Sequence, residues 1–213
     1  MSISASSIQH ESLEDVLHYE TGIIIERGLT MTKPGSVKYL LYGKQPSTQS
    51  LNIRMGKVGE KIMIWLINNY SNAELLAHGI VTLNNGERKD VDLLWRNIET
   101  NTVYYRELKS NANLDTEKVP ATLKKIEQIK EGFLYPTYGK DVTFDVAILN
   151  WGVYERSDYH RVPSQINVFE EAGIRITHLK DDLEVVGYEW SKEEFHACFR
   201  DIGRRFQKML NDV

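Results

Sequence analysis

Three short segments in the middle of the chain have the arrangement of apolar positions that is typical of β-strands. They cover residues 77–83, 90–95 and 103–109. Asn84-Asn85-Gly86 separates the first two segments, and Asn and Gly tolerate the positive φ angles of a tight hairpin turn. A second turn at residues 97–101 separates the last two segments. The pattern therefore predicts a three-stranded meander.

Helical patterns flank this meander on both sides. Residues 58–70 predict a helix packed against the sheet, and residues 120–131 predict a second helix with its apolar residues on one face. Gly132 would end the second helix, because glycine is common just past a helix C-terminus. The apolar run 144–149 then predicts a buried strand.

The remaining segments predict further elements around that core. Residues 13–26 begin as a short helical pattern and pass into a strand-like run at 22–26. Weaker strand patterns occupy residues 174–178 and 183–188, and Ser191 begins a final helix. We expect an α/β fold with a mixed central sheet flanked by helices.

The composition is that of an ordinary soluble globular protein, with 41% hydrophobic and 26% charged residues among 213. That length suits a single domain with a sizeable core. The formal net charge of −4 argues against a chain coated in basic residues, but a local basic patch can still bind nucleic acid. No apolar run approaches the ~20 residues of a membrane span, and the N-terminus lacks the pattern of a signal peptide.

Cysteine and histidine usage favours a cytoplasmic location and gives no sign of a zinc site. Cys198 is the one cysteine, so no intrachain disulfide can form, and its apolar helical surroundings predict a buried, inert thiol. The six histidines are scattered without metal-binding spacing, and there is no cysteine cluster. Neither a phosphate-binding Gly-Lys-Ser/Thr loop nor a glycine-rich dinucleotide motif occurs, so ATP-driven and redox chemistry have no support.

The candidate chemistry lies on the second and third predicted strands, at Asp92 and at Glu107-Leu108-Lys109. Residues two apart in a strand point the same way, so Glu107 and Lys109 share a face. If the turn registers the strands suitably, the Asp92 and Glu107 carboxylates converge. With the Leu108 backbone carbonyl they would offer hard oxygen ligands to Mg²⁺, which lowers the pKa of a bound water and offsets charge on a phosphate. Lys109 would orient the attacking water and help stabilise the pentavalent phosphorane.

Two alternatives stay open for these charged residues. Asp90 lies two residues before Asp92 on the same face of its predicted strand, and it competes with Asp92 as the acid that meets Glu107. The charged residues could also form the solvated face of an exposed hairpin, with Glu107 and Lys109 as an ordinary surface pair.

The order of elements and the spacing of the charges resemble the PD-(D/E)xK nuclease superfamily, which includes the type II restriction endonucleases. The resemblance covers residues 58–150 approximately, as a helix, a three-strand meander, a helix and a strand. Asp92 matches the first acid of the motif, and Glu107-Leu108-Lys109 matches its E-x-K. Glu60 matches an acid that many members carry near the metal site, although the helix dipole alone would favour an acid there. No proline precedes Asp92, which leaves Asp90 as a competing first acid, but the resemblance favours Asp92 because an apolar run follows it directly, as is usual in the family's strand. Arg106 stands where an apolar residue is more usual.

The resemblance implies a single nuclease domain over residues 1–213, with a catalytic core at about 58–150 and peripheral strands and a C-terminal helix at 151–213. It implies a Mg²⁺-dependent endodeoxyribonuclease that cuts double-stranded DNA at a specific site, acting as a homodimer on a palindrome. Two alternatives are another nuclease role on the same fold, in repair, junction resolution or transposon-end cutting, and a non-enzymatic binding module.

A second feature concerns the binding of the nucleic acid. The stretch from Gly28 to Gly59 contains no Asp or Glu but several cations, which could contact phosphates while polar neighbours read base edges. A polar surface loop with a chance bias in charge is the alternative. The residues after Lys109 and the lysines at 118, 124 and 125 form a further candidate surface. The predicted DNA-binding residues are Lys33, Lys38, Lys44, Gln45, Ser47, Thr48, Gln49, Arg54, Lys57, Ser110, Asn111 and Asn113.

Overall fold

The computed structural model of the chain describes residues 12–26, 30–70, 72–110, 118–139 and 141–211. Within these ranges the side chains of residues 25, 26, 48, 49 and 209–211 are not described. In the described part, five strands form one mixed sheet in the order β1-β2-β3-β4-β5. The expected α/β fold with a central mixed sheet is therefore confirmed.

The first three strands form the predicted meander. Each of these strands is antiparallel to its neighbour in the meander, whereas the last two strands run parallel to the third. The strands are β1 (Ala73–Thr82), β2 (Arg88–Asn97), β3 (Thr102–Lys109), β4 (Thr143–Asn150) and β5 (Arg175–His178). The carboxyl ends of β3, β4 and β5 consequently lie along one edge of the sheet, with Lys109, Asn150 and His178 in register.

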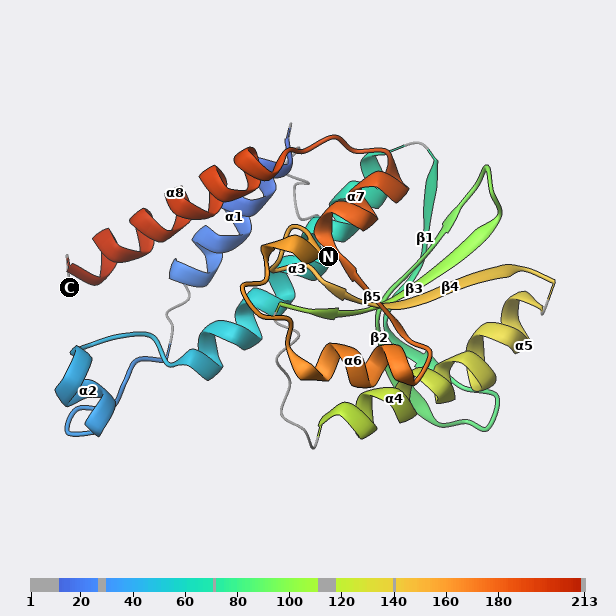
Figure 1. Cartoon of the computed structure of the whole chain (residues 1–213), viewed down its shortest axis with the longest axis horizontal. Coiled ribbons are helices and arrows are strands. Elements are labelled where there is room, and N and C mark those ends of the chain that lie inside the picture. Colours follow the sequence, from blue (N-terminus) through green and yellow to red (C-terminus); the bar gives the residue numbers. More distant parts are fainter. Residues whose placement is uncertain (1–11, 27–29, 71, 111–117, 140, 212–213) are drawn as a thin grey trace, which may run out of the picture.

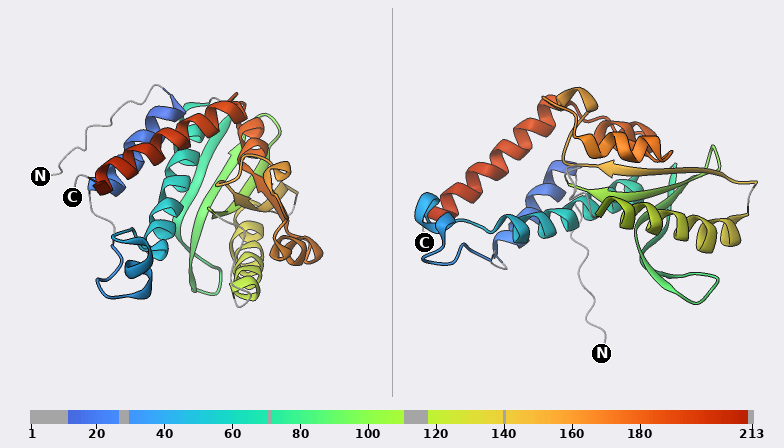
Figure 2. Two further views of the ribbon diagram at one scale, coloured as in Figure 1. Left: turned by 60° about the vertical axis from the view of Figure 1, so that its left-hand side comes forward. Right: turned by 60° about the horizontal axis from the view of Figure 1, so that its bottom comes forward.

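Helices cover both faces of this sheet (Figure 1). One hydrophobic cluster joins the sheet to α1 (Leu13–Glu26), α3 (Thr48–Asn69), α7 (Leu179–Val186) and α8 (Lys192–Asn211). A second cluster joins the other face to α4 (Lys118–Ile129), the π-helical turn Lys130–Leu134, α5 (Tyr135–Tyr138) and α6 (Ser164–Glu171). Figure 2 shows the short helix α2 (Val37–Tyr42) standing apart from both layers, and none of its residues is buried. No helix in the described ranges has the length and apolar content needed to cross a membrane.

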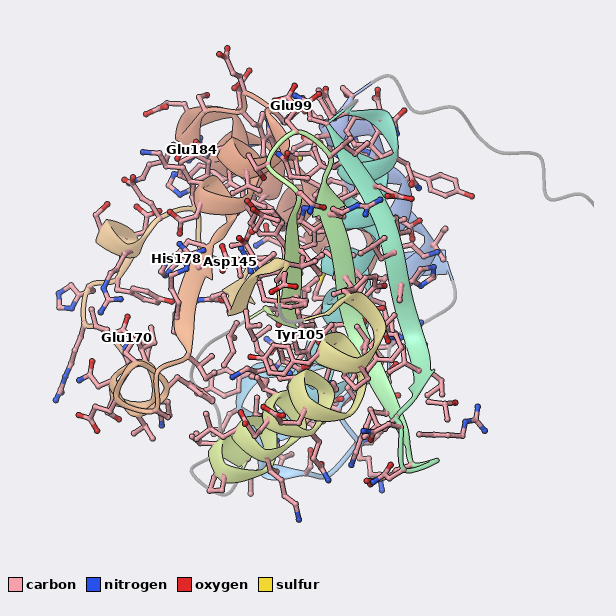
Figure 3. The ribbon with its side chains drawn as sticks, turned by 90° about the vertical axis from the view of Figure 1, so that its right-hand side faces the viewer. Glu99, Tyr105, Asp145, Glu170, His178 and Glu184 are labelled. Carbon is pink, nitrogen blue, oxygen red and sulfur yellow. The ribbon has the colours of Figure 1, made fainter. Side chains whose placement is uncertain are left out.

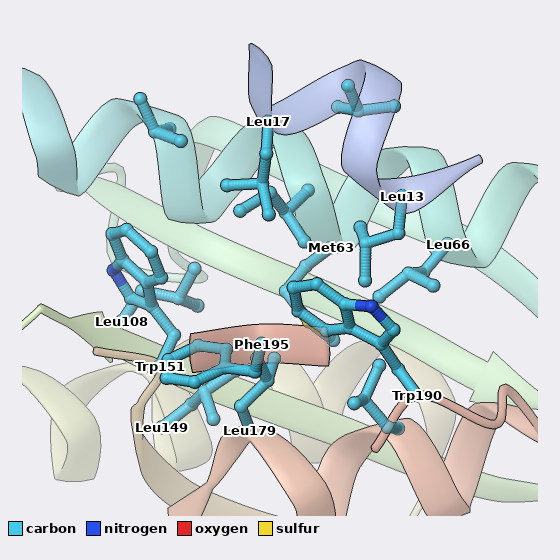
Figure 4. Packing of buried hydrophobic residues seen from close by; sticks show 14 of the residues in the cluster. Leu13, Leu17, Met63, Leu66, Leu108, Leu149, Trp151, Leu179, Trp190 and Phe195 are labelled. Carbon is cyan, nitrogen blue, oxygen red and sulfur yellow. The ribbon is translucent and has the colours of Figure 1, made fainter. Parts of the chain in front are cut away.

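The alternation of side chains along the strands explains how one chain fills two cores. On β3, Val103 and Tyr105 belong to the cluster under α4, whereas Leu108 belongs to the cluster under α1 and α3. Figure 4 shows the latter cluster, where Trp151 and Trp190 pack among leucines from several helices. Gly59 lets α3 pack closely against Trp151, because a Cβ at this position would collide with the indole ring. The strand end that carries Glu107 and Lys109 is thus supported from both faces.

Two of the predicted strands are helical. The strand predicted at 22–26 is wrong, because α1 continues through Glu26 and buries Ile24 against its neighbours, so tertiary packing outweighs the β-branched preference. The strand predicted at 183–188 is also wrong. There α7 begins after a capping box between His178 and Asp181, and ends at Gly187, which has a φ of 78°.

Two predicted helix boundaries also differ. Gly132 does not end the helix after the meander, since the chain continues through the π-helical turn and α5 to Gly139. Gly132 instead allows a close approach to Leu83, whose side chain would lie 3.2 Å from an added Cβ. Helix α3 begins at Thr48, ten residues before the prediction, because Ser47 caps it by accepting a hydrogen bond from the Ser50 amide at 3.1 Å. The capped final helix after Ser191 is confirmed.

Arg106, which departs from the usual apolar residue, is fully buried on the face opposite Glu107. Its Nε donates to Asp182 Oδ1 at 2.9 Å and its Nη1 lies 3.2 Å from Asp145 Oδ1. The guanidinium carbon of Arg106 also lies over the rings of Trp95 and Tyr104, at 5.3 and 5.2 Å from their centroids. Burial alone would lower the pKa of Arg106, but the two aspartates raise it, so the guanidinium stays charged and ties β3, β4 and α7 together.

We predict that Asp182→Ala destabilises the protein by about 3–5 kcal/mol, because it removes the fully buried carboxylate partner of the Arg106 guanidinium and leaves only the partly exposed Asp145. Glu184→Ala, an exposed change on the same helix, should alter the free energy of unfolding by less than about 0.5 kcal/mol. Urea denaturation of both variants measures the difference. Equal stabilities would show that the buried pair does not hold α7 on the sheet.

Candidate active site

An irregularity between β1 and β2 positions Asp92. Ala77 pairs with Leu94 and Gly79 pairs with Val91. Between these two pairs β1 has one residue, whereas β2 has two, Asp92 and Leu93. Such a bulge turns side chains away from strict alternation. Val91 and Leu94 both enter the core under α4, and the Asp92 carboxylate turns to β3, where Oδ2 accepts a hydrogen bond from the Leu108 amide at 2.8 Å.

Glu107 lies at the end of β3, just beyond the last β2–β3 pair, Leu93 with Arg106. Its side chain is 5% exposed and receives three donors. Lys109 Nζ lies 2.7 Å from Oε1, while Lys125 Nζ and the Tyr105 hydroxyl lie 2.6 and 3.2 Å from Oε2. The prediction that Glu107 and Lys109 share a face of the strand is therefore confirmed.

Lys125 connects the two carboxylates. It comes from α4, and its Nζ lies 3.4 Å from Asp92 Oδ1 and 2.6 Å from Glu107 Oε2. One ammonium group thus occupies the space between the two acids. The structure brings Asp92, Glu107 and Lys109 together as expected, and it adds a second lysine and a tyrosine. Figure 3 shows Tyr105 on β3 beside α4.

Burial and mutual repulsion control the charges of this site. Burial, and then the charge of Glu107, raise the pKa of Asp92. Burial would also raise the pKa of Glu107, but Lys109 and Lys125 outweigh it and hold this pKa below its usual value. Burial and the two carboxylates raise the pKa of Tyr105, so its hydroxyl remains a hydrogen-bond donor. The two lysines therefore favour the ionised form of both acids against the effect of burial, and they outweigh burial at Glu107.

The site adjoins a groove between α3 and α4. The groove has a volume of about 490 Å³ and is lined by Lys109 and Lys125 of the site, together with Asn52, Ile53, Lys118, Ala121 and Thr122. Both site lysines are 23% exposed, whereas Glu107 is nearly enclosed. An extended anionic ligand in this groove would meet the lysines first and the carboxylates behind them.

The predicted acid Glu60 lies on α3 but is held by a different partner. Lys57 Nζ contacts both of its carboxylate oxygens, at 2.7 and 2.9 Å. The hydrogen bond that Lys57 donates to Glu60 is the largest cause of the raised pKa of Lys57, and the charges of Asp90 and Asp92 also contribute. The Lys57–Glu60 pair therefore lies within electrostatic range of the site. The alternative first acid, Asp90, is exposed, whereas Asp92 is only 14% exposed and is the one that contacts Lys125.

The predicted DNA-binding residues do not gather in one place. Lys38 lies on the separate helix α2, Lys33 and Lys44 lie on either side of it in the sequence, and all three are exposed. Arg54 and Lys57 lie on α3, where they line a pocket against α1 that shares Ile53 with the groove. Ser47 serves as the cap of α3, and Gln45 and Ser110 are half-buried. Gly28, Asn111, Asn113 and the side chains of Thr48 and Gln49 lie outside the described residues.

Sequence reasoning missed a cluster formed by Glu14 and His18 of α1 and Cys198 of α8, whose ligand atoms lie within 4.8 Å of one another. No histidine pair has metal spacing along the sequence, and only the packing of two helices distant in sequence creates the cluster. The expectation of a buried thiol is confirmed, since burial, then Glu14 and Asp201, raise the pKa of Cys198 to about 12.

No family model matches this chain, and no curated protein matches its sequence.

We predict that Asp92→Asn makes the metal-free protein more stable than the wild type at neutral pH. The raised pKa of Asp92 means that the native state holds its proton more tightly than the unfolded chain, so the ionised carboxylate opposes folding at neutral pH. An asparagine oxygen can still accept the Leu108 amide. The gain should disappear as the pH falls below the ordinary aspartate value of 3.8, where Asp92 is protonated in both states.

Thermal unfolding of wild type, Asp92→Asn and the exposed control Asp90→Asn over a range of pH measures this effect. The control should show no comparable gain. A lower melting temperature for Asp92→Asn at neutral pH would contradict the electrostatic account of the site.

Proposed function

We propose that this protein is a Mg²⁺-dependent endodeoxyribonuclease that hydrolyses phosphodiester bonds of double-stranded DNA at a specific site, like a type II restriction enzyme. The observation that carries the proposal is the meeting of Asp92 and Glu107 around a single cationic group, with Lys109 on the outer side of Glu107. The order α3, β1-β2-β3, α4, β4 is also the order that the resemblance to the PD-(D/E)xK nucleases implies.

The residues present fit a divalent cation of the magnesium type. Asp92 and Glu107 supply hard carboxylate oxygens, and their mutual repulsion would be relieved by a cation placed between them. Lys125 Nζ already occupies that position, which shows that a cation can contact both acids at once. When bound there, Mg²⁺ would lower the pKa of a water molecule and offset charge on the phosphate. The Leu108 carbonyl remains part of the proposed ligand set.

The lysines have separate roles in this proposal. Lys109, released from Glu107, holds the attacking water and a phosphate oxygen where negative charge increases in the transition state. Lys125 neutralises the acids until the metal binds, and then turns to the phosphate in the groove that it lines. Cations of α3 near the groove, Arg54 and Lys57, contact the DNA backbone. A homodimer belongs to the proposal, because its two-fold axis would match a palindromic site.

We predict that Glu107→Ala, Asp92→Ala and Lys109→Ala each reduce Mg²⁺-dependent plasmid cleavage by at least about a thousandfold, since each removes a metal ligand or a charge on the reacting phosphate. DNA binding should be largely retained, because Lys118 and Lys125, which also line the groove, remain in all three variants. The measurement is digestion of a defined plasmid with mapping of the ends, and a DNA-binding assay on the same variants.

Asp90→Ala is the matched control and should cleave like the wild type. Full activity of Glu107→Ala would refute the assignment. Ends at one recurring sequence favour a restriction role, whereas cuts only in branched or mismatched DNA favour a repair or resolving nuclease.

We predict that Lys125→Met binds Ca²⁺ about tenfold more tightly than the wild type. The substitution removes an ammonium that competes for the same two carboxylates, and charges this close interact by several kcal/mol even at an effective dielectric constant of about 20. Isothermal titration calorimetry with Ca²⁺ measures the affinity, and Lys124→Met, an exposed neighbour on α4, is the control. Weaker binding by Lys125→Met than by this control would contradict the shared position of lysine and metal.

A further inference from the structure

The cluster between α1 and α8 is separate from the carboxylate pair and has different chemistry. Glu14 and His18 are one helical turn apart on α1, and Cys198 and Asp201 are nearly one turn apart on α8. His18 Nε2 lies 3.5 Å from Glu14 Oε1 and 3.8 Å from Asp201 Oδ2. The ligand atoms of Glu14, His18 and Cys198 all lie within 4.8 Å of one another. Glu14, His18 and Cys198 thus form a three-residue cluster across two helices, and Asp201 lies beside it, next to His18.

The distances between these atoms fit an ion better than they fit hydrogen bonds. An N–H···O hydrogen bond spans about 2.7–3.2 Å, so the contacts of His18 Nε2 at 3.5 and 3.8 Å are too long for strong ones. Tetrahedral zinc with bonds of about 2.0–2.2 Å to nitrogen and oxygen separates its ligands by about 3.3–3.6 Å. The contact of His18 Nε2 with Glu14 Oε1 already falls within that range. Asp201, whose side chain is 34% exposed, has to move closer to complete the set.

We propose that Glu14, His18, Cys198 and Asp201 bind a structural Zn²⁺ ion. One sulfur, one imidazole nitrogen and two carboxylate oxygens suit zinc, because thiolate and imidazole are poor ligands for Mg²⁺. Four protein ligands close the coordination shell, which is the arrangement of a structural site and not of a catalytic one. The proposal goes beyond the nuclease function and does not depend on it.

The surroundings of the cluster leave the ligands available. His18 Nδ1 is buried and has no hydrogen-bond partner in the part of the chain that the structure describes, so no bond fixes the ring in one orientation. Asp201 pairs with Arg204 at 3.1 Å and Arg205 at 2.9 Å, but these are solvated contacts within one helix and contribute little stability. The carboxylate can therefore leave the arginines for a divalent ion.

Such an ion would fasten α8 to α1. The two helices already share a core, in which Leu17 of α1 and Ile202 of α8 are buried. The ligands lie at the outer margin of this contact, where Glu14 is 57% exposed and Cys198 is buried. A metal bound to the native state alone adds its binding free energy to folding. The ion would act as a cross-link that a single cysteine cannot provide through a disulfide.

The experiment is a Zn²⁺ titration of the chelator-treated full-length chain, with bound metal measured by mass spectrometry and melting temperature measured in parallel. We expect one tightly bound Zn²⁺ and a rise in melting temperature. Co²⁺ as a probe should give a sulfur-to-cobalt charge-transfer band. Cys198→Ala and His18→Gln should each weaken Zn²⁺ binding by at least about a hundredfold, since even partners of metal ligands affect affinity 10–100-fold.

Two controls make the result decisive. His196→Gln, on the same helix but outside the ligand set, should bind Zn²⁺ like the wild type. Asp92→Asn should retain the ion and the cobalt band, which separates this site from the carboxylate pair. Zinc binding that survives Cys198→Ala and His18→Gln but is lost in Asp92→Asn would overturn the proposal. Absence of binding by the wild type at micromolar Zn²⁺ would overturn it as well.

Discussion

The carboxylates of Asp92 on β2 and Glu107 at the end of β3 are buried close together, and the local structure depends on how their repulsion is offset. Asp92 and Glu107 both reach the Nζ of Lys125, and Lys109 holds the free oxygen of Glu107. Burial strengthens repulsion and attraction alike, so the site is stable only while cations remain in contact with it. The bulge in β2, the Leu108 amide and the position of α4 are the parts of the fold that keep those charges in contact.

Both faces of β3 carry buried charged residues, and each face neutralises them differently. Arg106 is fully enclosed, and Asp182 and Asp145 hold it by hydrogen bonds that link strands to α7. Removing Asp182 there leaves a buried donor of the guanidinium without its carboxylate, which is the behaviour of a structural pair. On the opposite face the lysines of the site are partly exposed and line a groove. Their cations can be exchanged for another cation, so that face suits a functional site.

The sequence predicted what depends on local periodicity. The meander followed from three strand patterns, and the common face of Glu107 and Lys109 followed from alternation. The sequence did not predict features that depend on contacts between residues far apart in the chain. These are the extra residue in β2, the position of Lys125 between the two acids, and the contact of α1 with α8. Helix α7 was different, because Leu179, Leu183 and Val186 at helical spacing and the Gly187 stop were readable in advance. There a short apolar run was misinterpreted as a strand.

The distribution of charge favours a polyanion at the groove despite the acidic total. The net charge of −4 belongs to the whole chain, whereas the walls of the groove carry Lys118 and Lys125 from α4, with Arg54 and Lys57 of α3 nearby. Local potential, not the total, controls how a charged ligand approaches. An exposed hairpin face would keep Asp92 and Glu107 in water, where their repulsion is weak. The burial of the ionised Asp92 behind a cationic groove destabilises the folded protein, as its raised pKa indicates, and retained destabilisation of this kind is typical of a site with a function.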